Sequence, residues 1–261
     1  SQGYEIEAVP HLGYQLRSTP DLLSAHEIQF GLKTKLIGQK IFAFDSLPST
    51  MDEAFRLGML GEPEGSVVCA EGQTKGRGRL GRVWVSPKGK GIYCSIILRP
   101  KLAPTQMSRL TLMSAVALAQ AIEKTTNIKP SIKWPNDLIL GSKKVAGILT
   151  ELRAEVDQVN FVVVGIGINV NSTASQLLDT ATSIKNETHK QINRIEFFQE
   201  ILKSIEKWYS TVLKGDFDEV ISYARKNSAT LKKHVRIADA SGIVEGQAVD
   251  IDTDGGLLIR L

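Results

Sequence analysis

One stretch of apolar residues at helical spacing, bordered on both sides by short strand-like runs, restricts the fold more than any other feature of this sequence. Between Met107 and Lys124 apolar side chains recur three or four residues apart, which predicts a helix with one face in a core. Strand-like runs lie at 41–45, 66–70, 92–98, 132–134, 144–151 and 160–168, and further helices are predicted after Ser49-Thr50 and at 194–213 and 217–226. Because helices and strands do not alternate regularly, an α+β fold is favoured over a βαβ array.

Both ends of the chain differ in character from this central part. From His234 onward, short alternating strands at 235–237, 243–251 and 257–259 are separated by Gly and Asp turns, which is typical of a small β-barrel. The boundary is expected near 214–230. Residues 1–20 read as strand, turn and strand, a hairpin too small to fold alone.

The composition excludes several classes of protein. No apolar run approaches the roughly 20 residues that span a bilayer, and the N-terminus lacks a signal-peptide pattern, so no membrane partner is expected. The two cysteines, Cys69 and Cys94, lie inside strand-like runs, which favours buried free thiols in a reducing cytoplasm over a disulfide. A formal net charge of +4 is too small to argue for nucleic acid by itself.

A basic, glycine-rich segment, Gly76 to Trp84 (GRGRLGRVW), directly follows a strand-like run. Glycine lets the backbone approach a ligand closely, arginine offers planar donors for phosphate or carboxylate, and Trp84 can stack on a ring or exclude water. The segment alone fits a loop closing over an anionic ligand as well as it fits a solvated basic loop or an RNA-binding stretch. It is not a Walker A loop, and Gly165-Ile166-Gly167 is only a weak dinucleotide signal.

A second motif, Lys133-Trp134-Pro135-Asn136-Asp137, ends a strand in a turn and is followed by Lys144 on a returning strand. A carboxylate and a lysine placed in this way could share a polyphosphate site, with Asp137 meeting magnesium and Lys144 a phosphate. Taken alone, these residues fit an ordinary hairpin with solvated charges better.

Together the two motifs are far more specific. Gln73 to Arg79 with Trp84, Lys133 to Asp137, Lys144 to Ile148 and Gly165 to Asn169 resemble the biotin–protein ligase family in content and order, from about residue 40 to the C-terminus. The resemblance implies a class II aminoacyl-tRNA-synthetase-like catalytic domain at 21–215, with a mixed sheet flanked by helices. It also implies a small SH3-like β-barrel at 216–261, which stops before a hairpin that the family usually adds.

The resemblance further implies a set of site residues. Biotin contacts are expected from Ser49, Thr50, Gln73, Gly76, Arg77, Arg79, Lys144 and Gly147. Nucleotide contacts are expected from Arg79, Arg82, Trp84, Asn136, Lys144 and Asn169. Lys144, Arg79 and Asp137 would be catalytic, and Asp137 would also be the magnesium ligand.

The implied activity is activation of biotin by ATP with Mg²⁺, giving biotinyl-5'-AMP and pyrophosphate. Biotin would then pass to a lysine of a biotin carboxyl carrier protein domain. Lipoate–protein ligation, a binding-only regulator that responds to biotinyl-AMP, and an RNA-binding protein are the alternatives.

Residues 1–20 resemble the wing hairpin of the winged-helix domain in the bifunctional, DNA-binding members. We therefore expect a parent protein that also represses a biotin operon, with operator DNA bound by the full-length protein and not by this chain. A homodimer is among the expected assemblies, because bifunctional members dimerise through the ligase domain. An unrelated N-terminal hairpin is the alternative.

Overall fold

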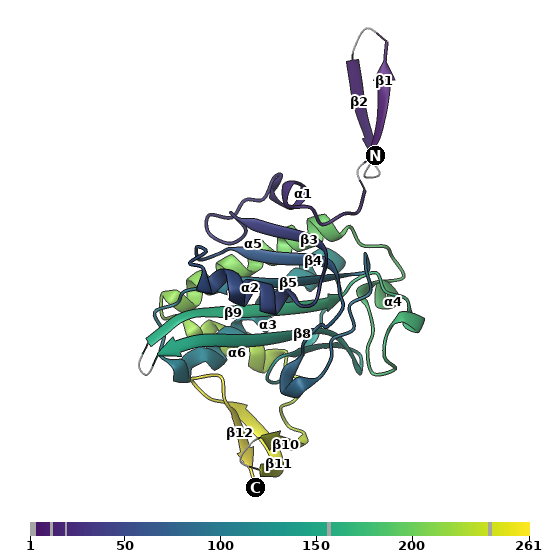
Figure 1. Cartoon of the computed structure of the whole chain (residues 1–261). Helices are drawn as coiled ribbons and strands as arrows, with labels where there is room; N and C mark the ends of the chain where they lie inside the picture. Colours follow the sequence, from purple (N-terminus) through teal and green to yellow (C-terminus); the bar gives the residue numbers. More distant parts are fainter. Residues whose placement is uncertain (1–3, 11–12, 19, 156–157, 240–241) are drawn as a thin grey trace.

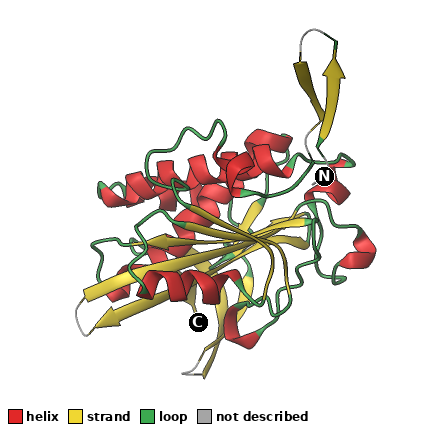
Figure 2. Ribbon diagram, turned by 45° about the horizontal axis from the view of Figure 1, so that its top comes forward, coloured by secondary structure: helices red, strands yellow, loops and turns green. Residues whose placement is uncertain are grey.

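The structure, a computed structural model, describes all residues except 1–3, 11–12, 19, 156–157 and 240–241. A seven-stranded mixed sheet lies between helices, and a small antiparallel sheet lies toward each end of the chain (Figures 1 and 2). The strands of the seven-stranded sheet are β3 (Ile41–Leu47), β4 (Val67–Gln73), β5 (Gly91–Leu98), β6 (Ser131–Lys133), β7 (Asp137–Leu140), β8 (Lys143–Glu155) and β9 (Gln158–Asn169). They lie in the order β3-β4-β5-β9-β8-β7-β6. β3 and β4 pair in parallel, and the other neighbours in the described chain pair antiparallel.

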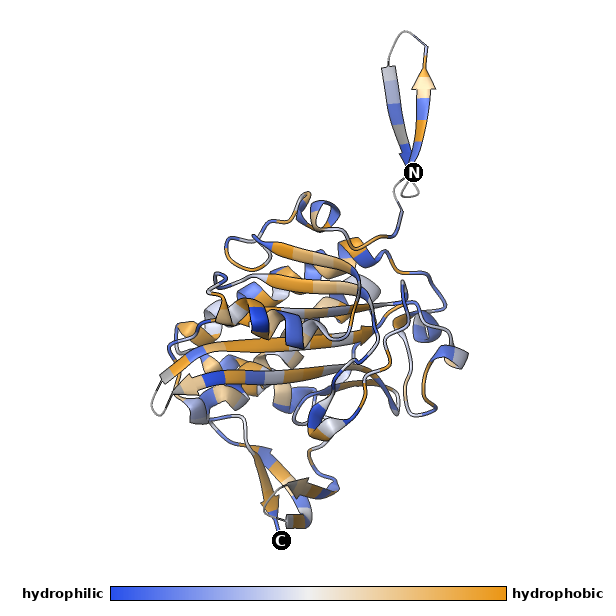
Figure 3. Cartoon of the chain, viewed as in Figure 1, coloured by the Kyte–Doolittle hydropathy of each residue, from blue (hydrophilic) through white to orange (hydrophobic). Residues whose placement is uncertain are grey.

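The helices are α1 (Ala25–Gln29), α2 (Thr50–Met59), α3 (Met107–Thr126), α4 (Ile184–Thr188), α5 (Arg194–Leu213) and α6 (Phe217–Lys226). Four of them cover the two faces of this sheet. α3, α5 and α6 pack together over one face, and α2 contacts β4, β5 and β9 on the other. Apolar side chains of the central strands enter the core on alternate sides, as the pleat of a strand requires. In Figure 3 the apolar colour runs along much of β9.

These elements confirm the predicted α+β class and the mixed sheet flanked by helices. The short helices α1 and α4 and the strand β7 were not predicted from the sequence. Asp137, expected within the turn, is the first residue of β7, because the turn after β6 closes within Trp134 to Asn136.

The two terminal sheets are small. β1 (Glu5–Val9) and β2 (Gly13–Ser18) form a hairpin that projects from the body in Figure 1, while His11 and Leu12 of the predicted turn lie outside the described residues. Near the C-terminus, β10 (His234–Asp239), β11 (Gly242–Ile251) and β12 (Leu257–Arg260) form a three-stranded antiparallel sheet. This sheet is the small β domain expected from the sequence.

The packing of α6 bears on the boundary expected at residue 216. Its buried side chains, including Phe217 and Val220, belong to the same core as α3 and α5. A boundary after Lys226 therefore follows the packing better than one at 216, and the separate sheet begins only at His234.

Two predictions from composition can also be compared with the structure. Cys69 and Cys94 are free and buried, as predicted. Among the helices of the described chain, none is long and apolar enough to cross a membrane.

Candidate active site

The site lies on the face of the sheet that α2 covers, at a place where glycines leave the strand surface without side chains. On β9, Phe161 and Val163 pack under α2, and Gly165 and Gly167 continue the same row. A Cβ atom on Gly167 would lie 2.6 Å from the indole of Trp84, and one on Gly165 would lie 2.3 Å from the Met51 sulfur. Glycine at both positions thus makes room for side chains from α2 and from the basic loop.

The basic loop, Gly76 to Trp84, folds back on itself across this glycine-lined face of the sheet. We call this loop the tongue. The Trp84 N–H donates to the Gly76 carbonyl over 2.9 Å, and the Gly78 N–H donates to the Arg82 carbonyl over 2.8 Å. A Cβ on Gly76 would lie 2.4 Å from the Trp84 carbonyl oxygen. Gly76, expected to contact biotin, is therefore required by the close approach of backbone within the loop, and it is not among the residues lining the cavity below.

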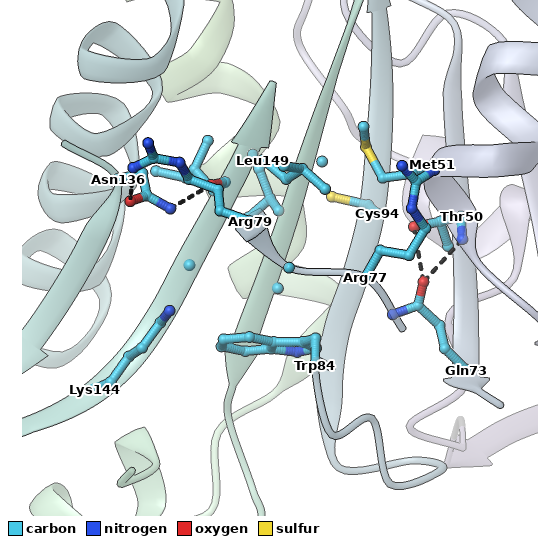
Figure 4. Close-up of a pocket in the computed structure, with 16 residues that line it drawn as sticks. Thr50, Met51, Gln73, Arg77, Arg79, Trp84, Cys94, Asn136, Lys144 and Leu149 are labelled. Atoms are coloured by element: carbon cyan, nitrogen blue, oxygen red, sulfur yellow. Dashed lines mark hydrogen bonds between the residues drawn. The ribbon is translucent and has the colours of Figure 1, made fainter. Parts of the chain in front are cut away.

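A cavity lies between the tongue and the sheet (Figure 4). Its lining residues are Thr50, Met51, Gln73, Arg77, Gly78, Arg79, Trp84, Cys94, Asn136, Lys144, Gly147, Ile148, Leu149, Gly165, Ile166 and Gly167. We call it the first cavity. At one end, the backbone N–H of Thr50 donates to Gln73 Oε1 over 2.8 Å, and Ser95 Oγ donates to Thr50 Oγ1 over 2.9 Å. This end offers polar atoms, whereas Met51 and Leu149 make apolar walls.

Ser49 stands directly before α2, where the hydroxyl of either Ser49 or Thr50 could cap the helix. Ser49 makes no side-chain capping bond, and Thr50 Oγ1 is engaged with Gln73 and Ser95. Ser49 is 1% exposed, and its hydroxyl has no partner. Such a group costs free energy unless something else binds it. Ser49 does not line the first cavity but is the neighbour of Thr50, which does.

Arg77 lies over the first cavity and is held from two sides. Its guanidinium forms ion pairs with Asp52 of α2 and with Glu151 of β8. These two carboxylates come from two elements that both line the cavity, and neither was predicted from the sequence. They fix the tongue across the opening.

The opposite end of the first cavity is cationic. The Lys144 ammonium lies 2.7 Å from an Asp137 carboxylate oxygen and 5.2 Å from the centroid of the Trp84 ring. Arg79 donates to Asn136 Oδ1 over 3.1 Å. Figure 4 shows Lys144, Arg79 and Asn136 together at this end, with Thr50 and Gln73 at the other.

A second, larger cavity adjoins the first. It is lined by Gly78, Arg79, Leu80, Arg82, Val83, Trp84, Val85, Trp134, Pro135, Asn136, Asp137, Lys144, Asn169, Leu177, Leu178, Thr180, Ala181, Arg236, Ile237 and Ala238. Of the predicted nucleotide contacts, Arg82 and Asn169 line this cavity alone, and Asn169 Oδ1 is buried without a partner. The other four line both cavities and form their shared wall: Arg79, Trp84, Asn136 and Lys144.

The charge around the second cavity suits a polyanion. Arg79, Arg82, Lys144 and Arg236 line it, with Asp137 as the acidic residue in its lining. No group of three or more His, Cys, Asp or Glu side chains in the described chain could hold a metal ion by itself. Any divalent ion here would therefore depend on the ligand for most of its oxygen atoms.

A thiol nucleophile is excluded at this site. Cys94 lines the first cavity, but burial raises the pKa of its thiol well above the usual range, so the thiol stays protonated near neutral pH. The chemistry available is instead that of cations and hydrogen-bond donors around two joined cavities.

The sequence reading missed residues that tertiary structure brings to the site. Met51 and Leu149 are apolar and belong to regular elements, so nothing in their local sequence distinguishes them from core residues. Arg236 lies in the C-terminal sheet, remote in sequence from both motifs. The signal that could have identified Asp52 is its position as the acidic residue nearest Ser49-Thr50 in the first turn of α2.

Two joined cavities with a cationic wall between them fit a ligase that uses a nucleotide, and comparison with known proteins agrees. Residues 43–169 match the biotin/lipoate A/B protein ligase family, and residues 230–261 match the biotin protein ligase C-terminal domain. The chain is 41% identical to the bifunctional ligase/repressor BirA of Bacillus subtilis over 99% of its length and 81% of that protein. It is 31% identical to the biotin–[acetyl-CoA-carboxylase] ligase of Paracoccus denitrificans, over 81% of this chain and 90% of that protein. The chain belongs to the biotin protein ligase family.

Solved structures agree with this assignment. The biotin protein ligase of Aquifex aeolicus, solved with biotin and ATP, superposes with a TM-score of 0.73 at 31% identity, covering 85% of this chain and 91% of that one. The match to the biotin-type C-terminal domain favours biotin over the lipoate alternative.

Proposed function

We propose that this protein activates biotin with ATP to give biotinyl-5'-AMP and then transfers biotin to a lysine of a biotin carboxyl carrier protein. The observation that carries the proposal is the shared wall of Arg79, Trp84, Asn136 and Lys144 between two cavities. Two ligands seated in these cavities would meet at that wall, as a reaction between two substrates requires.

The lining of the first cavity matches the chemistry of biotin at each end. Thr50 and Gln73 offer polar atoms for the ureido ring, and Met51 and Leu149 offer apolar surface for the ring system and chain. The carboxylate of the chain then points toward Lys144. Ser49, with its unpaired hydroxyl beside Thr50, is a further donor for the ureido group.

The second cavity fits ATP. Arg79, Arg82 and Lys144 supply positive charge for the triphosphate, and Asn169 keeps an acceptor unpaired there. Asp137 supplies one carboxylate beside this cavity, which fits a Mg²⁺ ion held mainly by phosphate oxygens and water. When bound, Mg²⁺ would neutralise charge on the polyphosphate and on the departing pyrophosphate.

The proposed chemistry has two steps. In the first, a biotin carboxylate oxygen bonds to the α-phosphorus of ATP, and the bond from that phosphorus to the bridging oxygen breaks, releasing pyrophosphate. Lys144 and Arg79 stabilise the charge that develops at the transferring phosphoryl group, while the tongue excludes water. In the second, the acceptor amine bonds to the acyl carbon and loses a proton, and AMP leaves with the electron pair.

Biotin-dependent exchange between ATP and labelled pyrophosphate tests the first step. Exchange should require biotin and should not occur with lipoate in its place. Attachment of biotin to a carrier domain, compared with a domain whose acceptor lysine is replaced by arginine, tests the second. Exchange without any transfer would point to a regulator that makes biotinyl-5'-AMP as its signal, and absence of biotin-dependent exchange would overturn the proposal.

A second function, repression of transcription, is favoured by the 41% identity to the bifunctional ligase/repressor BirA of Bacillus subtilis. We propose that the β1–β2 hairpin belongs to an operator-binding part, that a protein carrying the complete part binds operator DNA as a homodimer, and that these 261 residues alone do not bind it. A gel-shift assay with biotin and ATP, paired with sedimentation velocity, tests both points. A specific shift by this chain would contradict the second.

A further inference from the structure

Trp134 lies in the motif beside Asn136 and Asp137, yet the chemistry proposed above gives it no part. Its indole N–H donates to the Gly255 carbonyl over 2.9 Å, a contact between residues 121 positions apart in the chain. Gly255 lies in the turn 252–256, which joins β11 to β12. The motif that lines both cavities is thus bonded directly to the C-terminal sheet.

The turn that accepts this bond is tightly built. The Asp252 carboxylate accepts from the backbone N–H groups of Asp254 and Gly256 over 2.8 and 2.7 Å. The start of α3 holds the turn from the other side: Ser108 Oγ donates to the Asp254 carbonyl over 2.8 Å, and Arg109 pairs with the Asp254 carboxylate at 2.7 Å. Because the turn is fixed in this way, its contacts with Trp134 and with α3 determine where the adjoining strands β11 and β12 lie.

The C-terminal sheet, which contains this turn, contributes to the lining of the second cavity. β11, which leads into the turn, pairs with β10, with Arg236 opposite Glu245. Arg236, Ile237 and Ala238 of β10 line the second cavity. The placement of this wall therefore depends on how the C-terminal sheet is seated on the catalytic domain.

We propose that Trp134 is a positioning residue for the nucleotide site. Its hydrogen bond to Gly255 holds the C-terminal sheet in the position in which β10 lines the second cavity. The proposal rests on the proposed function in one respect, namely that ATP occupies that cavity. The first cavity is not lined by Trp134 or by the C-terminal sheet, so biotin binding should be independent of this anchor.

The variant Trp134→Phe keeps an aromatic ring and removes the indole N–H. The KM for ATP in pyrophosphate exchange should rise about three- to tenfold, the range for one buried neutral hydrogen bond, with an unchanged Kd for biotin. Trp208→Phe is the matched control: its indole N–H donates to Gln120 over 2.9 Å, and it lines neither cavity. This control should leave the KM for ATP unchanged.

Trp134 itself lines the second cavity, so its substitution could also change contacts with ATP directly. A further variant must therefore weaken the attachment of the turn 252–256 at a residue outside the cavity. Ser108→Ala removes a bond to the same turn from a residue outside the first and second cavities, and it should raise the KM for ATP in the same direction. Combined with Arg236→Gln, Trp134→Phe should add little further effect, because the wall residue that it positions is already altered.

Hydrogen exchange supplies a readout that does not depend on activity. Amides of 234–239 and 242–260 should exchange faster in Trp134→Phe than in Trp208→Phe, with β4, β5 and β9 unchanged. Unaltered exchange in these segments, a wild-type KM for ATP, or effects of Trp134→Phe and Arg236→Gln that simply add would overturn the proposal. Absence of biotin-dependent exchange in the wild-type protein would instead count against the proposed function, and the amide measurement would still decide whether Trp134 is the anchor.

Discussion

Lys144 and Asp137 form an ion pair, with the ammonium 2.7 Å from the carboxylate, at the wall shared by the two cavities. The pair joins the first residue of β7 to the second residue of β8, so the hairpin between these strands brings them together. Asp137 orients a cation that would otherwise be a flexible side chain, and it leaves the ammonium within reach of ligands on both sides.

The variant Lys144→Ala should reduce biotin-dependent pyrophosphate exchange about 100-fold or more, because it removes positive charge where negative charge develops. Biotin binding should weaken much less, since the polar contacts of Thr50 and Gln73 remain. Lys143→Ala, at the exposed neighbouring position on β8, is the control and should keep wild-type exchange. Steady-state exchange and calorimetry measure the two effects. Wild-type exchange in Lys144→Ala would remove this residue from the reaction.

The unpaired hydroxyl of Ser49 gives a second prediction. Ser49→Ala removes a buried group without a partner, so thermal stability without ligand should stay the same or rise. The Kd for biotin should increase roughly fivefold, as expected for one lost hydrogen bond of about 1 kcal/mol. Ser66→Ala is the matched control, since Ser66 is also buried and unpaired but, unlike Ser49, has no chain neighbour that lines either cavity. Equal biotin affinities in the two variants would show that the Ser49 hydroxyl does not bind biotin.

Gly167→Ala should damage the site while preserving the fold. The new Cβ would lie 2.6 Å from Trp84 Cε2 and Nε1, so the indole must move from its place between the cavities. Overpacking of this kind costs about 1–3 kcal/mol, which predicts a loss of biotin affinity of about tenfold. Adding Trp84→Phe, a smaller ring, should recover part of that loss. Calorimetry measures affinity and circular dichroism checks the fold; a double variant weaker than Gly167→Ala would mean that the clash lies elsewhere.

The two thiols give a prediction about pH. Burial raises the pKa of Cys69 to about 12 and raises the pKa of Cys94 well above its usual range. Neither should react with a thiol reagent at pH 8 in the folded protein, whereas both should react in denaturant. The stability that Cys69 contributes is complete below its unfolded pKa of about 8.5 and is lost as the pH rises from there toward 12, so the Tm should fall across that range. Rapid labelling of the folded protein would show that these strands open readily.

Much of the fold follows from local sequence. The helix at Met107–Thr126 and strands such as Gly91–Leu98 were predictable, because helical spacing and continuous apolar runs reflect burial within a single element. The tongue and the motif at Lys133–Asp137 could be identified because glycine, arginine and proline restrict the backbone locally. Strand β7 was missed, because its four residues are too few to show a pattern between two turns.

Only the tertiary structure decided how these pieces form two joined cavities. Sequence spacing does not reveal that Asp52 and Glu151 hold Arg77 from opposite sides, nor that Gly167 makes room for Trp84. It also does not place Arg236 beside a motif about 100 residues earlier in the chain. The physical reason is that propensity and periodicity act over a few residues. The contacts that shape a site are instead set by strand order and by which elements pack on which face of the sheet.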